Sequence, residues 1–360
     1  MARANQARLN LQALRHNLAH ARRLAPAAKV MAVVKANGYG HGAVTVAQAL
    51  APQADALAVA TIDEAMELRA AGLVAPVLLL EGVFEASELD IAARENFWIT
   101  IDNGQQLQWL EQARLPAPLR CWLKVDTGMH RLGVPAAETA DFHQRLSACG
   151  NCQAEIVACT HFASADDLDS KQTNEQLALF EQATAGLGVL RSAANSPAVL
   201  GWPASHYDWI RPGYMLYGDS PFPAPHPNAA PLRPVMTLCS SVISLREVDA
   251  GESVGYGASW TAQRPSRIAT VSIGYGDGYP RQAANGTPVL VRGQRAPLAG
   301  RVSMDMITVD VTDLPEVRLG DEVVLWGEGL PVGEIGAHAG TIGYELTTRM
   351  PARTPRVVIP

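Results

Sequence analysis

Lys35 stands at a position in the sequence where chemistry is possible. It lies near the end of the apolar run Lys29–Ala36, and the chain continues as Ala-Asn-Gly-Tyr-Gly-His41. Burying a lysine at the end of a strand costs free energy unless the amine has a function, and an amine can form a Schiff base with a carbonyl compound. The alternative is a surface lysine whose aliphatic stem lies along the protein.

Two later segments contain residues that suit an anion. Ser196 stands where a helix is expected to begin, and Gly213 allows the backbone to approach a bound group closely. On the last two strands of a barrel, such residues lie where phosphate groups commonly bind. A lysine amine and a phosphate site at the same end of a barrel indicate pyridoxal 5'-phosphate as the cofactor. Each feature alone is common, so the inference depends on their joint position.

The elements that have to position these residues are eight short apolar runs, which alternate with amphipathic stretches. Between the runs lie helix start signals, such as a capping box at Thr61–Glu64, Asn103 and Pro135. Repeats of this kind predict an α/β fold with a parallel (β/α)8 barrel, whose functional residues lie where the strands end. A doubly wound sheet is the alternative. The runs are Lys29–Ala36, Ala56–Ala60, Val77–Glu81, Phe97–Ile101, Arg120–Val125, Glu155–Thr160, Leu190–Ala194 and Tyr207–Arg211.

The composition changes after the eighth run. Ser220–Pro234 is rich in proline, which interrupts helices and strands and is typical of a linker. β-rich segments at short spacing follow, which predicts a C-terminal all-β domain closed by one short helix. We therefore expect a barrel over residues 11–220, a linker over 221–234 and a β-domain over 235–360, to which an N-terminal strand within residues 1–10 belongs.

The overall composition excludes several classes of protein. Of the 360 residues, 48% are hydrophobic and 18% are charged, which is the balance of a globular protein. The net charge of −6 gives no reason to expect nucleic acid or an anionic membrane as a partner. No apolar stretch is long enough to span a bilayer, and the first residues, MARANQARLN, contain no hydrophobic signal segment. We therefore expect a cytoplasmic protein.

The five cysteines are too few, and odd in number, for a disulfide framework. Cys149 and Cys152 form one C-x-x-C pair, which is typical of a redox site or of half a zinc site. No second pair follows at zinc spacing, and this pair precedes a strand, on the side of a βα unit that rarely carries chemistry. We therefore predict no metal site and a structural role for the pair.

Seven segments resemble the successive motifs of bacterial alanine racemases. They are VVKANGYGHG, KVDTGMHRLG, THFASAD, RPGYMLYG, VGYGASW, GYGDGYPR and GRVSMDM. The resemblance extends from Leu11 to about Arg356, and one departure is Gly38, where the family usually has alanine. It implies an isomerase that uses pyridoxal phosphate to interconvert L-alanine and D-alanine for peptidoglycan synthesis. It also implies a homodimer with shared active sites.

The resemblance implies two catalytic bases on opposite faces of the substrate. Lys35 would hold the cofactor through its amine and act as one base. Tyr256 resembles the second base, so that one group removes the α-proton and the other returns a proton to the opposite face. A phenol is a poor base unless positive charge lies nearby, and His161 and Arg211 are expected to supply that charge. An aromatic side chain packed on a glycine-rich turn is the alternative for Tyr256.

Three cationic residues have implied roles around the cofactor. Arg211 resembles the arginine that faces the pyridine nitrogen, where most pyridoxal enzymes have a carboxylate. An arginine cannot accept a proton from that nitrogen, so the ring is a weaker electron sink and transamination is reduced. The alternative for Arg211 is an ion pair with Asp208 or Asp219. Arg131 resembles the arginine that contacts the phenolic oxygen and the substrate carboxylate, and Lys124 resembles the lysine that is often carbamylated to hold it.

The other implied site residues lie in the cofactor pocket, on the substrate side and at the entrance. His41, beside the lysine motif, has no expected catalytic role. The cofactor-binding positions are Lys35, Tyr39, Arg131, His161, Asn195, Ser196, Arg211, Gly213, Tyr214 and Tyr344. The substrate side has Arg131, Met304 and Asp305, and the entrance has Asp166, Tyr275, Arg281 and Arg301.

Three other functions compete with an alanine racemase. A non-catalytic pyridoxal-phosphate-binding barrel protein would lack the β-domain that supplies Tyr256. A decarboxylase of basic amino acids would have a carboxylate in place of Arg211. An amino-acid racemase of broader specificity would share every catalytic residue and differ only in the size of its pocket, so the sequence does not separate it from an alanine racemase.

Overall fold

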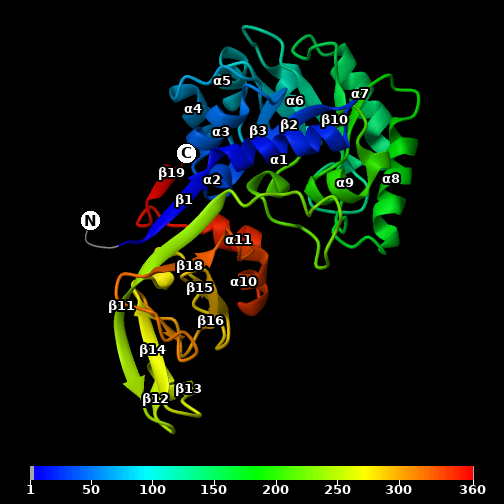
Figure 1. The fold of residues 1–360 in the computed structure, drawn as a ribbon. Helices are drawn as coiled ribbons and strands as arrows, with labels where there is room; N and C mark the ends of the chain where they lie inside the picture. Colours follow the sequence, from blue (N-terminus) through cyan, green and yellow to red (C-terminus); the bar gives the residue numbers. More distant parts are fainter. Residues whose placement is uncertain (1–3, 360) are drawn as a thin grey trace.

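The computed structural model describes residues 4–359, which form two bodies (Figure 1). A barrel surrounded by helices forms the upper body, and a twisted sheet forms the lower one. The long strand β11 (Met236–Val248) runs from the junction down through the lower body. Residues 1–3 and 360, which the expected domain ranges include, lie outside the described residues.

Eight parallel strands form the barrel, which confirms the predicted fold class. They pair in the order β10-β2-β3-β4-β5-β6-β8-β9. Between β9 and β10, single backbone hydrogen bonds run from Asp208 N to Arg191 O (3.1 Å) and from Arg211 N to Ala194 O (2.9 Å). The last predicted run therefore forms only a two-residue strand. The strands are β2 (Lys29–Val33), β3 (Ala56–Val59), β4 (Val77–Leu79), β5 (Phe97–Ile101), β6 (Cys121–Asp126), β8 (Val157–Cys159), β9 (Leu190–Ser192) and β10 (Trp209–Ile210).

Amphipathic helices cover the outside of the barrel, and polar side chains begin several of them. At the start of α6, Asn103 Oδ1 accepts a hydrogen bond from Gln106 N at 2.9 Å, as predicted. The predicted capping box at α4 is wrong, because within the described chain the Thr61 side chain makes no capping hydrogen bond. The helices are α1 (Leu11–Leu24), α3 (Ala43–Leu50), α4 (Ile62–Ala70), α5 (Glu88–Arg94), α6 (Gly104–Gln112), α7 (Thr139–Ala148), α8 (Lys171–Thr184) and α9 (Ser196–Gly201).

Three tryptophans fill the inside of the barrel. Trp98, Trp122 and Trp209 come from different strands, and their ring centroids lie between 5.6 and 6.4 Å apart. Smaller apolar side chains such as Met31 and Val157 pack around them. A second apolar cluster lies between the strands and the helices. Because side chains occupy the interior, ligands have access to the ends of the strands and not to a central pore.

The lower body, the β-domain, is a mainly antiparallel sheet with its own core. β1 pairs with β11 and β19, so the first and last described strands are neighbours. The domain has two short helices, α10 (Val332–His338) and α11 (Gly343–Thr348), where one was expected. Its strands, besides β11, are β1 (Gln6–Asn10), β12 (Ser253–Val254), β13 (Trp260–Thr261), β14 (Ser266–Val271), β15 (Pro288–Val291), β16 (Gln294–Pro297), β17 (Ile307–Asp310), β18 (Glu322–Trp326) and β19 (Arg356–Ile359).

The two bodies meet where the short turn α2 (Lys35–Tyr39) contacts α11. Gly40 ends that turn, and a Cβ there would lie 1.8 Å from the carbonyl oxygen of Thr347 in α11. Arg356 donates from Nε and Nη2 to the Gly40 carbonyl at 3.1 and 3.0 Å. The proline-rich segment between η3 (Tyr214–Tyr217) and β11 contains no helix or strand. The turn that begins at Lys35 is therefore held by both bodies.

Across residues 4–359, no helix has both the length and the apolar character needed to cross a membrane. Within the same range, no three His, Cys, Asp or Glu side chains are grouped so that they could hold a metal ion. All five cysteines are free. Cys152 makes a β-bridge with Leu119, just before β6, so the C-x-x-C pair lies at the opposite end of that strand from Asp126.

Candidate active site

Lys35 begins a left-handed turn that follows β2. The three residues after it have φ between 52° and 59°, and Tyr39 has φ of 50°. Such angles cost non-glycine residues about 1–2 kcal/mol each, so other contacts have to hold the turn. Asn37 Oδ1 supplies one by accepting from Ala43 N at 2.8 Å. Gly38, the departure from the family pattern, has φ of 59°, which glycine adopts without strain.

Glu64 holds this turn from the next βα unit. Its two carboxylate oxygens accept from Ala36 N at 2.6 Å and from Ala60 N at 2.7 Å. Hydrogen bonds from backbone amides to a carboxylate are stronger than those to a neutral acceptor. The capping motif predicts only a local role for Glu64 in α4, so its contact beside Lys35 cannot be read from the sequence.

Arg211 is buried and follows directly after β10. Its Nη1 donates to Ser192 Oγ at 2.6 Å, and its Nη2 donates to the carbonyl oxygens of Thr160 (2.5 Å) and Ala193 (3.3 Å). Burial lowers the pKa of the guanidinium, and the Cys159 thiol opposes this effect. Arginine keeps its charge at any physiological pH, so these contacts hold a positive charge at the end of the barrel.

Neither carboxylate considered for Arg211 pairs with it. Asp208 Oδ2 accepts from Arg191 N at 2.7 Å, and Asp219 Oδ2 accepts from Tyr214 Oη at 2.6 Å. Both carboxylates therefore have other partners, and the ion-pair alternative is wrong. The guanidinium is held by a hydroxyl and by carbonyl oxygens that carry no compensating negative charge.

Four cationic side chains affect His161, which follows β8. Burial lowers the pKa of His161 well below its usual value, and the four positive charges lower it further. The imidazole is therefore neutral at neutral pH. The expectation that His161 supplies positive charge is wrong, because burial and the surrounding cations keep its imidazole neutral, and the arginines and lysines supply the charge instead. They are Arg211, Lys124, Arg131 and Lys35, in decreasing order of effect.

Lys124 of β6 is partly buried among charges of its own sign. Burial is the largest cause of its lowered pKa, and Arg211 and Arg131 contribute to it, while Cys159 and Asp102 oppose it. A lowered pKa increases the fraction of neutral amine. The neutral amine is the form that can attack carbon dioxide, so the position is compatible with a carbamate.

Ser196, Gly213 and Tyr39 form a small polar cluster beyond β9 and β10. Ser196 Oγ accepts from Gly213 N at 2.9 Å and from Met215 N at 3.2 Å. A Cβ at position 213 would lie 2.5 Å from Tyr39 Oη, so the glycine leaves room for this hydroxyl. Burial raises the pKa of Tyr39 to about 12, so the phenol remains a hydrogen-bond donor. Asn195 lies next to Ser196 in the chain, with its Nδ2 3.4 Å from His161 Nε2.

Tyr344 of α11 connects the β-domain to this cluster. Its ring stacks on Tyr214 with centroids 3.6 Å apart, and it lies 6.3 Å from the Tyr39 ring. Burial raises the pKa of Tyr344, and negative charge at Asp166 adds to that effect. Asp166, a predicted entrance residue, therefore lies near the predicted cofactor-binding residues of the same chain.

A second group of predicted residues lies in neighbouring loops of the β-domain. A Cβ at Gly257, which follows Tyr256, would lie 3.4 Å from Arg301 Cζ. Gly276 follows Tyr275, and its backbone N–H donates to the carbonyl oxygen of Met304 at 2.9 Å. Arg353 forms ion pairs with Asp305 and, at 2.9 Å, with Asp277. Tyr275 and Arg281 line one cavity of about 480 Å³. The group comprises Tyr256, Tyr275, Arg281, Arg301, Met304 and Asp305.

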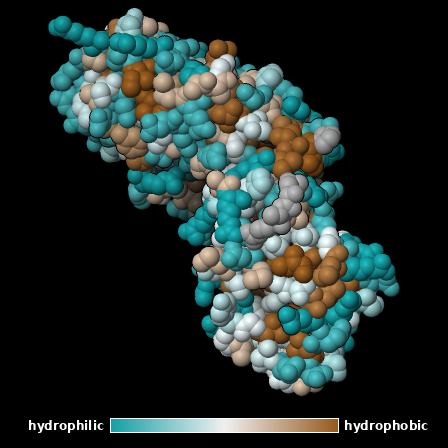
Figure 2. All heavy atoms as spheres, turned by 90° about the vertical axis from the view of Figure 1, so that its left-hand side faces the viewer, coloured by the Kyte–Doolittle hydropathy of each residue, from teal (hydrophilic) through white to brown (hydrophobic). Residues whose placement is uncertain are grey.

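Within one chain, Tyr256 of this second group does not lie beside Lys35. Tyr256 lies between β12 and β13, at the lower end of the β-domain and away from the barrel (Figure 1). Its side chain is 72% exposed, and that of Met304 is 52% exposed. Figure 2 shows hydrophobic side chains gathered on the surface of the lower body. The chain therefore carries two separate groups of candidate site residues.

Two residues at the site belong to none of the sequence motifs. Ser192 Oγ accepts from Arg211 and donates to Trp209 O at 2.8 Å. Gln176 of α8 donates to the carbonyl oxygen of His161 at 3.1 Å. Ser192 lies within the seventh predicted run, Leu190–Ala194, and ends the observed strand β9, so its place in a barrel strand was a signal that the sequence offered. Nothing in the sequence around Gln176 indicates its contact.

Comparison with known proteins covers both bodies. The alanine racemase N-terminal domain matches residues 9–221, and the alanine racemase C-terminal domain matches residues 235–358. The chain is 53% identical over 354 residues to the catabolic alanine racemase of Pseudomonas putida, with 98% of each chain covered. It is 51% identical over 351 residues to the alanine racemase of Vibrio cholerae, covering 98% of this chain and 97% of the relative.

Two solved structures share the fold over nearly the whole length. The biosynthetic alanine racemase from Pseudomonas aeruginosa has a TM-score of 0.96 and 50% identity, with 99% of this chain and 100% of that chain covered. The alanine racemase from Bartonella henselae, solved with covalently bound pyridoxal phosphate, has a TM-score of 0.89 and 31% identity, with 99% of both chains covered. The chain belongs to the alanine racemase family.

Proposed function

We propose that this protein is a pyridoxal-phosphate-dependent isomerase that interconverts L-alanine and D-alanine. Alanine racemases in general depend on this cofactor. The observation that carries the proposal is the group of cationic side chains around His161 at the end of the barrel, with Lys35 among them. The D-alanine would be used for peptidoglycan synthesis, and the cytoplasmic location remains a prediction from the sequence.

The residues at this end of the barrel fit pyridoxal phosphate. Tyr39, Ser196 and Gly213 would hold the phosphate, because a protonated phenol and a serine hydroxyl lie beside a glycine whose missing Cβ leaves room for that phenol. Tyr214 and Tyr344 would close that pocket from the side of α11. When bound, the cofactor supplies a ring that withdraws electrons from the α-carbon of an attached amino acid.

Arg211 would face the nitrogen of the cofactor ring. Its hydrogen bonds to Ser192 and Thr160 fix the guanidinium, which cannot accept a proton at any physiological pH. The ring nitrogen would therefore stay unprotonated, which limits electron withdrawal and reduces transamination. Asn195 and the neutral His161 would border the ring on the same side.

Lys35 and Tyr256 would act as the two bases. Lys35 Nζ would hold the cofactor and exchange a proton with the substrate α-carbon on one face, and Tyr256 Oη would do so on the other. Because Tyr256 is exposed and lies away from its own barrel, we propose that it reaches the barrel of a second copy. A two-fold homodimer provides two such shared sites.

The second copy would also supply the substrate side and the entrance. Met304 and Asp305 would line the substrate with Arg131, which would bind its carboxylate. The ion pair from Arg353 to Asp305 would fix that loop. Tyr275, Arg281 and Arg301 would surround the entrance, with Asp166 on the barrel. These roles follow from the family resemblance and from the neighbouring positions of the β-domain loops.

Lys124 would carry a carbamate. Its neutral amine would attack carbon dioxide, so that one N–C bond forms and one proton is released. The product has a negative charge in place of a positive one, and it would attract Arg131 where an unmodified lysine would repel it. The lowered pKa of Lys124 supports this proposal.

The direct test is interconversion of alanine enantiomers. The purified protein, supplied with pyridoxal phosphate, is incubated with L-alanine or D-alanine, and chiral chromatography follows the products. Both reactions are expected to reach the same equal mixture. In a panel of amino acids, serine should react more slowly and lysine and arginine hardly at all, because Tyr256 and Tyr344 would leave room for only a small side chain. Faster turnover of lysine or arginine would contradict the substrate assignment.

A further inference from the structure

A cavity of about 410 Å³ lies between the two bodies. None of the residues that line it belongs to either group of candidate site residues. Its walls come from the end of η3, from the linker at Leu232 and Pro234, and from Met236 and residues 326–332 of the β-domain. We call it the interdomain cavity. Its volume is in the range of pockets that bind small molecules.

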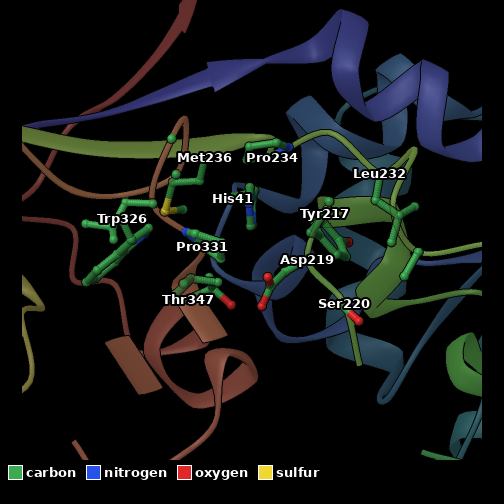
Figure 3. A pocket seen from close by; sticks show the side chains of 16 residues that line it. His41, Tyr217, Asp219, Ser220, Leu232, Pro234, Met236, Trp326, Pro331 and Thr347 are labelled. Atoms are coloured by element: carbon green, nitrogen blue, oxygen red, sulfur yellow. The ribbon is translucent and has the colours of Figure 1, made fainter. Parts of the chain in front are cut away.

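Two buried nitrogen atoms on its walls have no hydrogen-bond partner among the described residues. One is His41 Nε2, in a side chain that is 1% exposed. The other is Nε1 of the fully buried Trp326. Leaving a buried polar atom unpaired costs free energy, so each such atom calls for an explanation. Figure 3 shows the His41 ring in the middle of the lining side chains, between Pro331 and Tyr217.

The chemistry of His41 defines what it can bind. Its Nδ1 lies 2.9 Å from the Tyr39 carbonyl oxygen, which only accepts, so Nδ1 carries the proton and Nε2 has a free lone pair. Burial lowers the pKa of His41 to about 4, so the ring stays neutral. His41 Nε2 therefore requires an O–H or N–H donor.

The other walls favour an uncharged aromatic molecule. Pro331, Met236 and the rings of Tyr217 and Trp326 present flat or polarisable apolar surfaces. The Trp326 N–H can donate to the face of an aromatic ring. Asp219 also lines the cavity, but its Oδ2 already accepts from Tyr214 Oη at 2.6 Å. Its negative charge disfavours an anionic ligand.

We propose that the interdomain cavity binds a small uncharged aromatic molecule with one O–H or N–H group, which donates to His41 Nε2. The site adjoins the proposed cofactor pocket, because the His41 ring lies 4.6 Å from the Tyr217 ring, and Tyr217 stacks on Tyr39 at 4.7 Å. The ligand would thus contact the layer directly behind Tyr39. The proposal goes beyond the racemase reaction and does not depend on it.

The first test compares para-cresol with its methyl ether, para-methylanisole, by titration calorimetry on the full-length protein. The two probes have the same ring and methyl group, and only para-cresol has a donor. Para-cresol should bind once per chain, and the ether should bind about fivefold to tenfold more weakly because it cannot hydrogen-bond to His41. Equal affinities, or no binding of para-cresol, would overturn the proposal.

Variants locate the binding. Leu232→Trp fills the interdomain cavity and should abolish binding of para-cresol. The control Leu319→Trp adds the same side chain at a leucine that is 64% exposed and outside the cavity, so it should leave binding unchanged. His41→Phe should bind both probes equally. Unchanged binding in Leu232→Trp, or a retained preference for para-cresol in His41→Phe, would refute the site. The probe pair on the unaltered protein decides the question even if one variant does not fold.

Discussion

The barrel and the β-domain approach closely at Gly40, so Gly40→Ala tests how the two bodies are held together. The residue has φ of +80°, and a Cβ would lie 1.8 Å from Thr347 O and 2.7 Å from Thr347 C. Both atoms belong to the backbone of α11, so no side-chain rotation relieves the contact. The substitution has to move α2 away from α11 or distort one of them.

Gly72→Ala is the matched control. Gly72 has φ of +81°, and nothing lies within 4 Å of the position its Cβ would take. Both variants pay the same cost of about 1–2 kcal/mol for alanine in the left-handed region. Both also gain the same small amount from the reduced entropy of the unfolded chain. The difference between them therefore isolates the contact with Thr347, and overpacking of this kind costs about 1–3 kcal/mol.

The free energy of unfolding, from urea titration followed by circular dichroism, measures this difference. We expect Gly40→Ala to lose about 1–3 kcal/mol more than Gly72→Ala. It should also bind pyridoxal phosphate more weakly, because Gly40 adjoins Tyr39 in the turn that begins at Lys35. Equal losses in the two variants would show that the contact between α2 and α11 is not close in the folded protein, and would refute the reasoning.

Three further predictions concern single side chains. Burial lowers the pKa of His41 from 6.5 to about 4 in the folded protein. The unfolded chain therefore takes up a proton on His41 at a higher pH than the folded protein does. The free energy of unfolding should fall by about 3 kcal/mol as the pH decreases from 6.5 to about 4. His41→Phe should lack this part of the pH dependence in urea titrations, and identical slopes would contradict the prediction. Lys35→Ala should lose both racemisation and the covalent cofactor, as measured by mass spectrometry of the borohydride-reduced protein; full activity would exclude Lys35 as the cofactor lysine. Native mass spectrometry in bicarbonate should detect one added carbon dioxide per chain, and Lys124→Met should lack it; the adduct on both proteins would place the carbamate elsewhere.

The barrel could be predicted because its signals are local. Eight apolar runs of strand length alternate with amphipathic stretches, and burial on both faces of a parallel strand requires continuous apolar sequence. The cap at Asn103 is local as well, since donor and acceptor are three residues apart. The two-residue strand β10 shows the limit of this reasoning. Its length depends on how many of its residues pair with β2, and the apolar run alone does not give that number.

The details of the site could not be predicted, because contacts distant in the sequence determine them. The left-handed turn after Lys35 depends on Glu64, which is 28 residues from Ala36 and whose motif indicates only a helix cap. Arg211 takes its partners from Ser192 and Thr160 and not from the carboxylates that are nearest in sequence. The lowered pKa of His161 depends on its burial and on four cations from other parts of the chain, so its neutrality at neutral pH cannot be read from its own motif.

The most direct test of a shared active site is to mix two inactive variants, Lys35→Ala and Tyr256→Phe. In a mixed dimer, one site would contain Lys35 of one copy and Tyr256 of the other, both intact, and the second site would contain neither. If subunits exchange at random in an equal mixture, about a quarter of the unaltered racemase activity should return. Mass spectrometry of the dimers verifies the exchange. Demonstrated exchange with no recovery of racemisation would contradict the account, because Tyr256 would then have to serve the barrel of its own chain.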